Sequence, residues 1–479
     1  MRAASPLSYK QIMAETTTFP RRLLLGGAMV TGVLLALAVH MLGVRFGLDL
    51  GGLWRSDGAG FIPAGAAMAW WLLQPQTLTL ASGAKLTLVA VTYGQHHASP
   101  ILKSLDRPHQ SKARFDGTND FLVVWIRQQH NPNQWPLNYQ LFAYDRAATA
   151  CVGSSGTTGN ANRRRGDEIV GFRFDAFPRR QRKFELHVQE FTPRIGWQMR
   201  TNVFVISNPA RGPFPTWYPN SLPDTESDGD LDVTLTKLAS GAKTLYQRGG
   251  LRPDDPLNQG VMAGLQIQQN DHDAANWQPV QVVTSDATGN RVTAPVNNFG
   301  QGTGRVELYQ YGLWPDEPAW KVRFEFSRES GFTENELWTA QKVPIQPGQL
   351  QDFWRFGHNR ANPPFAETTV KGWHVKVFPA MQFSQPGGWG QLAGGIEVQA
   401  DPPPEGMRLT LVKVTDDQGQ EVPTVNAFNP GGGSYRFGLR DFGDTKSLNV
   451  TLALHQSRFI EFTAKPGPPA SRPPPDTNP

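Results

Sequence analysis

Beyond residue 77 of this chain, apolar side chains alternate with polar ones. In runs such as Phe184-x-Leu186-x-Val188, every second position is apolar, and Gly, Pro or Asn residues bound the runs. Successive side chains of a strand point to opposite faces, so this alternation is typical of half-buried β-strands. After residue 74, no long segment has the spacing of an amphipathic helix. The pattern predicts an all-β fold for most of the chain.

A motif of strand, aromatic corner and strand recurs three times along the chain. In each copy, an alternating strand is followed by an aromatic residue next to Pro or Gly, a few polar residues and a longer alternating strand. The corners are Phe177-Pro178, Trp314-Pro315 and Phe442-Gly443. Repeats of roughly 100 residues with this density of strands suit β-sandwiches. We therefore expect tandem immunoglobulin-like β-sandwich modules.

Two copies of the motif are preceded by a strand that ends in Asp, with Gly shortly after it. An Asp side chain accepts hydrogen bonds from nearby backbone N–H groups, and Gly tolerates a positive φ. The sequence thus predicts hairpin turns at Asp286–Gly289 and Asp416–Gly419.

An apolar segment, Leu23–Val44, lies near the N-terminus. His40 is its one strongly polar residue, and Arg21, Arg22 and Arg45 flank it. As a helix it spans about 33 Å, enough for a bilayer core of about 30 Å. The excess of Lys and Arg before the segment keeps the N-terminus in the cytoplasm. We expect a transmembrane signal-anchor helix, with the bulk of the chain exported.

Two other export signals fit the same region. Ala36-Leu37-Ala38 has the small residues of a signal-peptidase site, and Arg21-Arg22 has the pair found in twin-arginine signals. The apolar segment is long for a cleaved signal, and Pro20 rather than Ser or Thr precedes the arginines. The sequence favours an uncleaved anchor and leaves both alternatives open.

The predicted domain organisation begins with a cytoplasmic N-terminus (1–22), a transmembrane helix (23–44) and a juxtamembrane segment with a short helix (45–76). Three β-sandwich modules follow (77–208, 231–346 and 366–465). Pro-rich linkers (209–230 and 347–365) separate them, and a disordered Pro-rich tail (466–479) ends the chain. Pro lacks a backbone donor and stiffens the chain, so we expect extended linkers and modules strung semi-rigidly.

Composition adds a constraint on stability and compartment. The chain has 479 residues, 39% of them hydrophobic, with 48 Gly, 39 Pro and one Cys. The single Cys151 excludes an intramolecular disulfide framework and a metal site built from Cys alone. The modules must therefore be stable by packing alone. Because a long, cysteine-poor exported chain fits a bacterial envelope best, we expect the bacterial inner membrane, with the bulk periplasmic or extracellular.

An acidic stretch is the sharpest candidate site. Leu235 stands where a calcium loop has its bidentate Glu, and Leu231, Val233 and Leu235 alternate as in a strand. The stretch is either a calcium loop, in which alternate carboxylates converge on the cation, or an acidic turn exposed to solvent. Its candidate metal ligands are Asp224, Glu226, Asp228, Asp230 and Asp232. Calcium would be the only cofactor.

Other candidate residues do not form a known site. His96-His97 and Asp271-His272-Asp273 have no zinc spacing, and neighbours on a strand face opposite ways. The sequence contains no nucleophile elbow, no phosphate-binding loop and no dinucleotide fingerprint. We therefore predict no catalytic residue and no cofactor-binding residue.

Two features suggest partners. A basic cluster that includes Arg163–Arg165, Arg179 and Arg180 can attract anionic lipid, polysaccharide or nucleic acid, or it can be a solvated face. Export argues against nucleic acid. Exposed aromatic rings can stack on sugars or fill seams between modules. The aromatic candidates are Trp217, Tyr218, Trp354 and Trp389.

Together these features predict a membrane-anchored, extracytoplasmic, multi-module β-sandwich protein that acts as a binding or structural component of the cell envelope. The expected partners are the lipid bilayer, through residues 23–44, and envelope proteins or polysaccharide. The alternatives are an extracytoplasmic hydrolase or metal-dependent enzyme with a loop-borne site, and a glycan-binding protein. The enzyme alternative gains if the His96/His97, Asp271/His272 or Asp224–Asp232 groups meet in one concave site, and it loses support if they lie scattered on separate surfaces.

Overall fold

The computed structural model describes most of residues 76–467. Residues 1–75, residues 468–479 and several internal segments, the longest being 100–113, 159–166, 244–258 and 354–362, lie outside the described part. The transmembrane helix predicted at 23–44 and most of the predicted tail therefore fall outside it. Among the described residues, no helix is both long and apolar enough to cross a bilayer.

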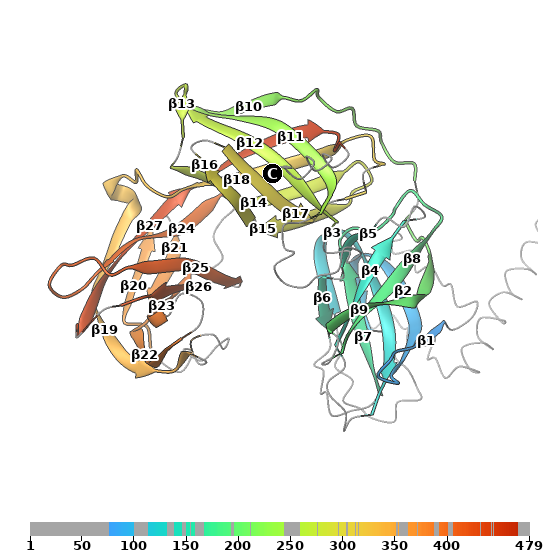
Figure 1. Cartoon of the computed structure of the whole chain (residues 1–479), viewed down its shortest axis with the longest axis horizontal. Helices are drawn as coiled ribbons and strands as arrows, with labels where there is room; N and C mark the ends of the chain where they lie inside the picture. Colours follow the sequence, from blue (N-terminus) through green and yellow to red (C-terminus); the bar gives the residue numbers. More distant parts are fainter. Residues whose placement is uncertain are drawn as a thin grey trace, which may run out of the picture.

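The described part has an all-β fold with several sheets, as predicted. Its strands form three units, which lie side by side with the second in the middle (Figure 1). The first unit contains β1 to β9, the second contains β10 to β18 together with β28, and the third contains β19 to β27.

The first unit consists of two facing sheets, with strand orders β1-β2-β3-β7-β6 and β5-β4-β8-β9. Apolar residues from both sheets fill the space between them, and the rings of Tyr139 on β4 and Phe172 on β7 have centroids 5.3 Å apart. The strands are β1 (Thr77–Thr79), β2 (Lys85–Ala98), β3 (Arg114–Gln129), β4 (Tyr139–Tyr144), β5 (Ala150–Gly153), β6 (Ser155–Thr158), β7 (Asp167–Phe174), β8 (Lys183–Thr192) and β9 (Gly196–Ser207).

The second unit has sheets of order β10-β11-β12-β17-β16, with β13 beside β12, and β15-β14-β18-β28. Val233 of β11, Phe324 of β18 and Phe462 of β28 belong to one buried cluster between them. The strands are β10 (Asp224–Asp228), β11 (Leu231–Lys243), β12 (Gln259–Gln269), β13 (His272–Asp273), β14 (Trp277–Asp286), β15 (Arg291–Pro295), β16 (Asn297–Gly302), β17 (Arg305–Tyr311), β18 (Trp320–Arg328) and β28 (Arg458–Ala464).

In the third unit, β19 connects two groups of strands. It pairs antiparallel with β27 over Leu337–Pro344 and parallel with β22 over Ile345–Gly348. The unit has its own buried cluster, which includes Ile396 and Val450. The elements are the 3-10 turn η4 (Glu334–Glu336) and strands β19 (Leu337–Gly348), β20 (Ala366–Val370), β21 (Trp373–Val377), β22 (Ala380–Gly387), β23 (Leu392–Ala400), β24 (Met407–Thr415), β25 (Thr424–Gly431), β26 (Ser434–Leu439) and β27 (Ser447–Gln456).

The predicted motif of strand, corner and strand is present in all three units. Its strands are β7 and β8, β17 and β18, and β26 and β27, and the two strands of each pair bond to different neighbours. In the first two units, the corner carries the chain from one sheet to the facing sheet. The predicted turns are also confirmed: the N–H groups of Gly289 and Gly419 bond to the carbonyls of Asp286 and Asp416, with φ of 90° and 84° at the two glycines.

The third unit interrupts the second in the sequence. In the first unit, β8 pairs with β9, the strand that follows it in the chain. The strand after β18 is β19, but β18 pairs with β28, and β19 pairs with β27 of the third unit. Only Ser457 separates β27 from β28. The third unit is thus inserted between two adjacent strands of the second, and in Figure 1 the red β28 lies among the green and yellow strands.

Strand pairing differs from the predicted ranges in three places. Strand β10 belongs to the second unit although it falls in the predicted linker 209–230, and β28 does so although it falls in the predicted module 366–465. Strand β19 belongs to the third unit. One buried cluster also extends through the first and second units. The alternation of apolar and polar residues predicts a strand, but it does not indicate the strand with which it pairs.

Candidate functional site

The acidic stretch forms the hairpin of β10 and β11 in the second unit. Asp228 pairs with Leu231 at the turn, where Gly229 has a φ of 67°. Along the hairpin, Ser227 Oγ donates to Asp232 Oδ1 over 2.5 Å, and Asn220 Nδ2 donates to Asp224 Oδ2 over 3.0 Å. Local polar neighbours therefore use part of the carboxylate capacity that a cation would need.

A cationic side chain from the end of the described chain occupies the turn. Arg458 Nη1 lies 2.5 Å from Asp230 Oδ1 and donates to the carbonyl oxygen of Asp228 over 2.7 Å. The guanidinium carbon is 4.9 Å from the centroid of the Trp277 ring. Hydrogen bonds from Gln269 and Arg458 lower the pKa of the Asp230 carboxyl. A positive group thus sits where the calcium hypothesis places the ion.

The remaining acidic residues do not gather around one point. Among the described residues, no group of three or more His, Cys, Asp or Glu side chains is placed to hold a metal ion. The calcium hypothesis for Asp224–Asp232 stays a prediction.

Of the histidine candidates, only His96 and His97 lie in a different unit from this turn. His272 lies near it, because it pairs with Gln269, whose side chain donates to Asp230 over 2.7 Å. His96 and His97 are on β2 of the first unit and face opposite ways: His96 pairs with Asp116 over 2.9 Å, and the buried His97 contacts Thr92 Oγ1 over 2.6 Å. Burial lowers the pKa of His97. Asp271 and His272 lie in the second unit, so the groups required by the enzyme alternative are divided between two units.

Part of the basic cluster holds the first and second units together. Arg179 is only 5% exposed. Its guanidinium donates to Asn290 Oδ1 (2.9 Å) and the Thr288 carbonyl (3.2 Å) of the second unit, and to the Tyr93 hydroxyl (3.0 Å) and the Asp120 carbonyl (2.8 Å) of the first. Burial lowers the pKa of Arg179. This residue is a structural clamp and not part of a solvated basic face.

The residues around Arg179 also connect the predicted corner at Phe177 with the predicted turn at Asp286–Gly289. Asn290 accepts from the Phe177 N–H over 3.1 Å and donates to the Phe177 carbonyl over 3.0 Å, while Asp286 Oδ2 accepts from Asn290 over 2.9 Å. Next to it, Arg180 Nε donates to Glu317 over 2.7 Å. Arg163–Arg165 lie outside the described residues.

The aromatic candidates are only partly described. Tyr218 is 82% exposed, and the Trp217 ring lies 5.4 Å from Lys321 Nζ on β18. Trp217 therefore lies against the second unit, while Tyr218 faces solvent. Trp354 and Trp389 lie outside the described residues.

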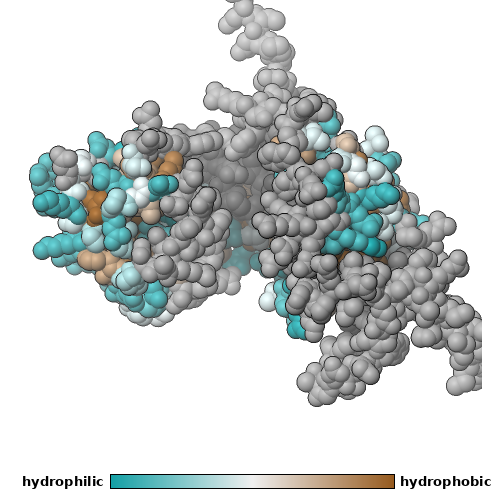
Figure 2. Space-filling model, turned by 90° about the horizontal axis from the view of Figure 1, so that it is seen from below, coloured by the Kyte–Doolittle hydropathy of each residue, from teal (hydrophilic) through white to brown (hydrophobic). Residues whose placement is uncertain are grey.

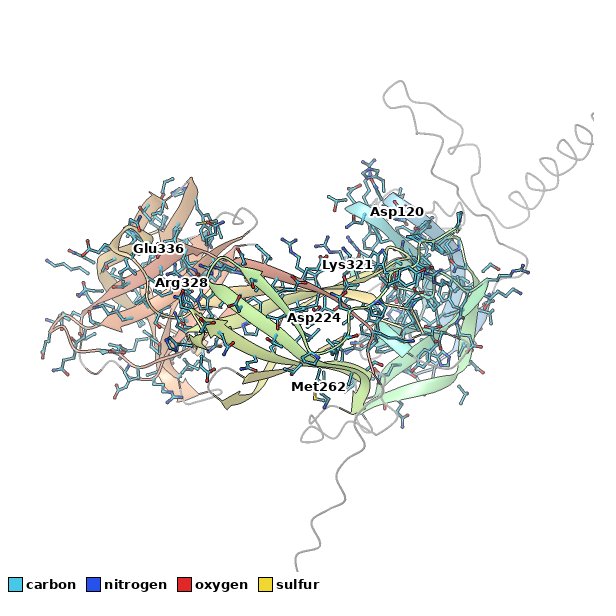
Figure 3. The ribbon with its side chains drawn as sticks, turned by 90° about the horizontal axis from the view of Figure 1, so that it is seen from above. Asp120, Asp224, Met262, Lys321, Arg328 and Glu336 are labelled. Atoms are coloured by element: carbon cyan, nitrogen blue, oxygen red, sulfur yellow. The ribbon has the colours of Figure 1, made fainter. Side chains whose placement is uncertain are left out.

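A hollow of about 320 Å³ lies where the third unit meets the β15-β14-β18-β28 sheet. Outward-facing side chains of the sheet form its floor, and the start of β24 forms its wall. Close to this junction, Arg328 at the end of β18 donates to Glu336 of η4 over 2.6 Å, and Figure 3 shows both residues where the two units meet. The hollow is lined by Gln281, Val283, Arg291, Thr293, Arg323, Glu325, Gly406, Met407, Arg408 and Phe459.

Glu325 is the one carboxylate in the lining, and its oxygens are engaged. Oε1 accepts from Arg408 Nε and from Ser457 Oγ, each over 2.6 Å, and Oε2 accepts from Arg408 Nη2. Arg408 Nη2 also donates to Gln281 Oε1 over 3.0 Å. The pair of Glu325 and Arg408 joins the two units and contributes no net charge.

The sequence contained a partial signal for this hollow. Lys321, Arg323 and Glu325 alternate with the core residues of β18, which marks them as outward-facing. Nothing local indicates that Arg408, from a later strand, lies against them.

Comparison with known proteins identifies no relative that would assign a role to these residues: no protein-family model matches the chain, and no curated protein matches its sequence.

Proposed function

We propose that this chain is a membrane-anchored, extracytoplasmic protein of three immunoglobulin-like β-sandwiches that acts as a binding or structural component of the cell envelope. The anchor is Leu23–Val44, with the N-terminus in the cytoplasm of a bacterial cell. The partners are the bilayer and envelope proteins or polysaccharide.

The main support for a binding or structural role is the way in which the second and third units are connected. Because the third unit is inserted between β18 and β28, the second unit is completed only by a strand that follows the third unit in the chain, and Arg408–Glu325 and Arg328–Glu336 cross their boundary. The Arg179 clamp fixes the first unit to the second. These contacts restrain both boundaries between units. They support an extended scaffold that presents surfaces between its units.

Two further observations support exposure to an aqueous compartment and a binding role. On the face drawn in Figure 2, the described apolar residues are isolated among hydrophilic ones. The candidate groups of the enzyme alternative are divided between two units: His96 and His97 lie on β2 of the first unit, and the other two groups lie in the second. Both support binding over catalysis.

Site-specific labelling tests the topology. The native thiol is removed by Cys151→Ser, and single cysteines are introduced as Tyr218→Cys, at a highly exposed position, and Ser8→Cys, before the apolar segment. We expect a membrane-impermeant maleimide to label Tyr218→Cys on intact spheroplasts and Ser8→Cys only after detergent lysis.

The fractionation of the same samples tests the anchor. The chain should stay in the membrane pellet after a carbonate wash. Labelling of Ser8→Cys but not Tyr218→Cys on intact spheroplasts would overturn the topology. Release of a shortened chain into the soluble fraction would replace the anchor with a cleaved signal.

A further inference from the structure

We propose that the boundary between the second and third units is an acid-sensitive joint, at which protonation of the buried His455 loosens the contacts of the third unit with the end of β18. The joint consists of the two chain connections that cross the boundary, residues 329–336 between β18 and β19 and Ser457 between β27 and β28. This inference goes beyond the proposed function, because it depends on the residues of the joint and not on the compartment of the chain.

The two connections lie side by side. On the side of the second unit, Phe326 of β18 pairs with Arg458 of β28. On the side of the third unit, Leu337 of β19 pairs with Ala453 of β27. Each pair lies within one unit, so movement at the joint leaves both pairs intact.

His455 contacts both units and one of the connections. The side chain is fully buried. Its Nε2 lies 3.4 Å from Ser327 Oγ of β18 in the second unit and 3.0 Å from Thr410 Oγ1 of β24 in the third. Its ring packs against that of Phe332, with centroids 4.9 Å apart. The ring thus lies where a movement of the third unit would expose it to water.

These contacts suit a neutral ring. Nδ1 lies 3.4 Å from the carbonyl oxygen of Gln456, which assigns the ring hydrogen to Nδ1 and leaves Nε2 as the acceptor for the two hydroxyl groups. Burial lowers the pKa of His455 to about 4, and the cations Arg328 and Arg408 add to this effect. In the closed joint, the ring is therefore neutral at pH 5 and above.

The charged groups around the ring come from three elements. Arg328 donates to Glu336 over 2.6 Å, and Arg408 bonds to Glu325, so that these four groups form two ion pairs. They belong to β18 (Glu325 and Arg328), η4 (Glu336) and β24 (Arg408), and the exposed carboxylates of the connection are Glu329 and Glu334. Asp401 and Glu405, which precede β24, lie outside the described residues; the desolvation of the ring, and not a sum of charges, opposes its protonation.

The carboxylates of the connection do not imitate the effect of the histidine. Burial acts to raise the pKa of Glu336, but hydrogen bonds from Thr333 and the charge of Arg328 outweigh it and lower that pKa. The ion pair of Arg328 and Glu336 therefore persists at pH 5. Partial burial raises the pKa of Glu329, so a proton on this carboxyl favours the closed joint, which is the opposite sense.

The shift of His455 sets the size of the effect. In an open joint the ring meets water, and its pKa returns to near 6.5. Below that pH the open joint takes up a proton that the closed joint does not, so the advantage of the closed joint is complete above pH 6.5 and is lost as the pH falls towards 4. With a pKa of about 4 in the closed joint, the equilibrium constant for opening should rise about thirtyfold between pH 7.5 and pH 5.

Hydrogen–deuterium exchange of the full-length protein, in micelles of an uncharged detergent, tests the joint. The reporters are the amides of Glu329, Glu336 and Ser457, which bond to the carbonyls of Asn276, Thr333 and Gly406. The reference is the buried strand β23 (Leu392–Ala400). Each exchange rate, divided by the intrinsic rate at the same pH, gives an opening constant.

We expect the opening constant of the reporters to rise about thirtyfold between pH 7.5 and pH 5. It should exceed that of β23 at both pH values and respond little to low concentrations of urea, because a local opening exposes little surface. Reporters that share the opening constant and urea response of β23 would mean that only global unfolding exposes them, and the proposal would be overturned.

Variants assign the effect to the histidine. His455→Gln keeps an acceptor for the Thr410 hydroxyl but takes up no proton, so the rise at pH 5 should be lost. The controls are Glu329→Gln, which removes a carboxylate of the same connection, and His272→Gln, at an exposed histidine of the second unit; both should keep the rise. An equal rise in His455→Gln and the wild type would also overturn the proposal.

A loss of fold does not make this test ambiguous. Each variant is checked by thermal unfolding at pH 7.5, and His455→Asn, a smaller neutral replacement, takes the place of His455→Gln if the latter does not fold. The pH profile of the wild type can overturn the proposal without any variant. A chain found in the cytoplasm by thiol labelling would contradict the proposed function and leave the joint unaffected.

Discussion

The guanidinium of Arg458 lies 2.5 Å from the carboxylate of Asp230, so the first residue of β28 closes the acidic turn between β10 and β11. The pair connects the end of the predicted linker 209–230 with the predicted module 366–465. The neighbouring cation offsets part of the repulsion between the acidic residues near this turn.

The first prediction concerns calcium at this turn. In Arg458→Ala the acidic residues lose their cationic neighbour, and we expect calcium to raise the melting temperature of this variant more than that of the wild type. Without calcium, Arg458→Ala should melt a few degrees lower, because the contacts with Asp230, Asp228 and Trp277 are lost. Differential scanning calorimetry with calcium and with magnesium measures both effects. A wild type that gains more from calcium than the variant would contradict the role of Arg458 and favour the calcium loop.

The second prediction concerns β28, the strand that returns to the second unit after the third. Phe462 is fully buried in the second unit, with its ring centroid 6.1 Å from that of Phe324. We expect Phe462→Ala to reduce the free energy of unfolding by about 3–5 kcal/mol, since it leaves a cavity in the core. Limited proteolysis should show new cleavage sites within residues 224–328, far from the substitution in sequence.

Thr463→Ala is the control for this variant. Thr463 is on the same strand but is not among the buried core residues, so its replacement should change stability by no more than about 0.5 kcal/mol. If Phe462→Ala exposed only the third unit to protease, the assignment of β28 to the second unit would be wrong.

The third prediction concerns the clamp between the first and second units. Arg179→Met keeps much of the side-chain length but removes hydrogen bonds to Asn290, Thr288, Tyr93 and Asp120. We expect a loss of about 3 kcal/mol, because four hydrogen bonds from a buried charged group are removed at once. Urea unfolding followed by intrinsic fluorescence measures it, with the exposed Arg182→Met as the control. Equal stability of the two variants would show that the clamp contributes nothing.

The fourth prediction concerns pH. Burial lowers the pKa of His455 to about 4, with contributions from the cations Arg328 and Arg408. The neutral ring lies 3.0 Å from Thr410 Oγ1 at the boundary between the second and third units. In the unfolded chain the pKa is near 6.5, so below that value the unfolded state takes up a proton that the folded state does not. This contribution to stability is complete above pH 6.5 and is lost as the pH falls towards 4.

Comparison of variants isolates this histidine from the other titrating groups. Between pH 6.5 and 4, the wild type should lose about 2 kcal/mol more than His455→Gln does. His272→Gln, which replaces an exposed histidine on β13, should keep the full loss. Urea unfolding at a series of pH values measures all three, and an identical acid response of His455→Gln and the wild type would rule out the assignment.

Much of the fold could be predicted because its signals are local. The alternation of apolar and polar residues along Trp320–Phe326 predicted the observed strand, since every second side chain there is buried. The turns at Asp286 and Asp416 depend on a side chain and a glycine within the same few residues. The acidic stretch was recognised as a turn before a strand for the same reason.

The sites could be predicted much less well. Arg179 and Arg180 suggested a solvated patch, whereas Arg179 is buried by the approach of the turn at Asp286–Gly289. The hollow combines Arg291 and Arg323 of the second unit with Arg408 of the third, so it depends on how the two units pack against each other. Charge along a sequence does not indicate which surface will later be covered.

The sequence by itself determined where the strands and turns are, because the alternation of apolar residues and the turn chemistry act over a few neighbouring positions. The tertiary structure alone decided which strands pair, which units share a core and which charges meet. Strands β19 and β28 have patterns compatible with either unit, and their partners depend on contacts between segments far apart in the chain. The contact of Arg458 with Asp230 is a consequence of the return of β28 to the second unit.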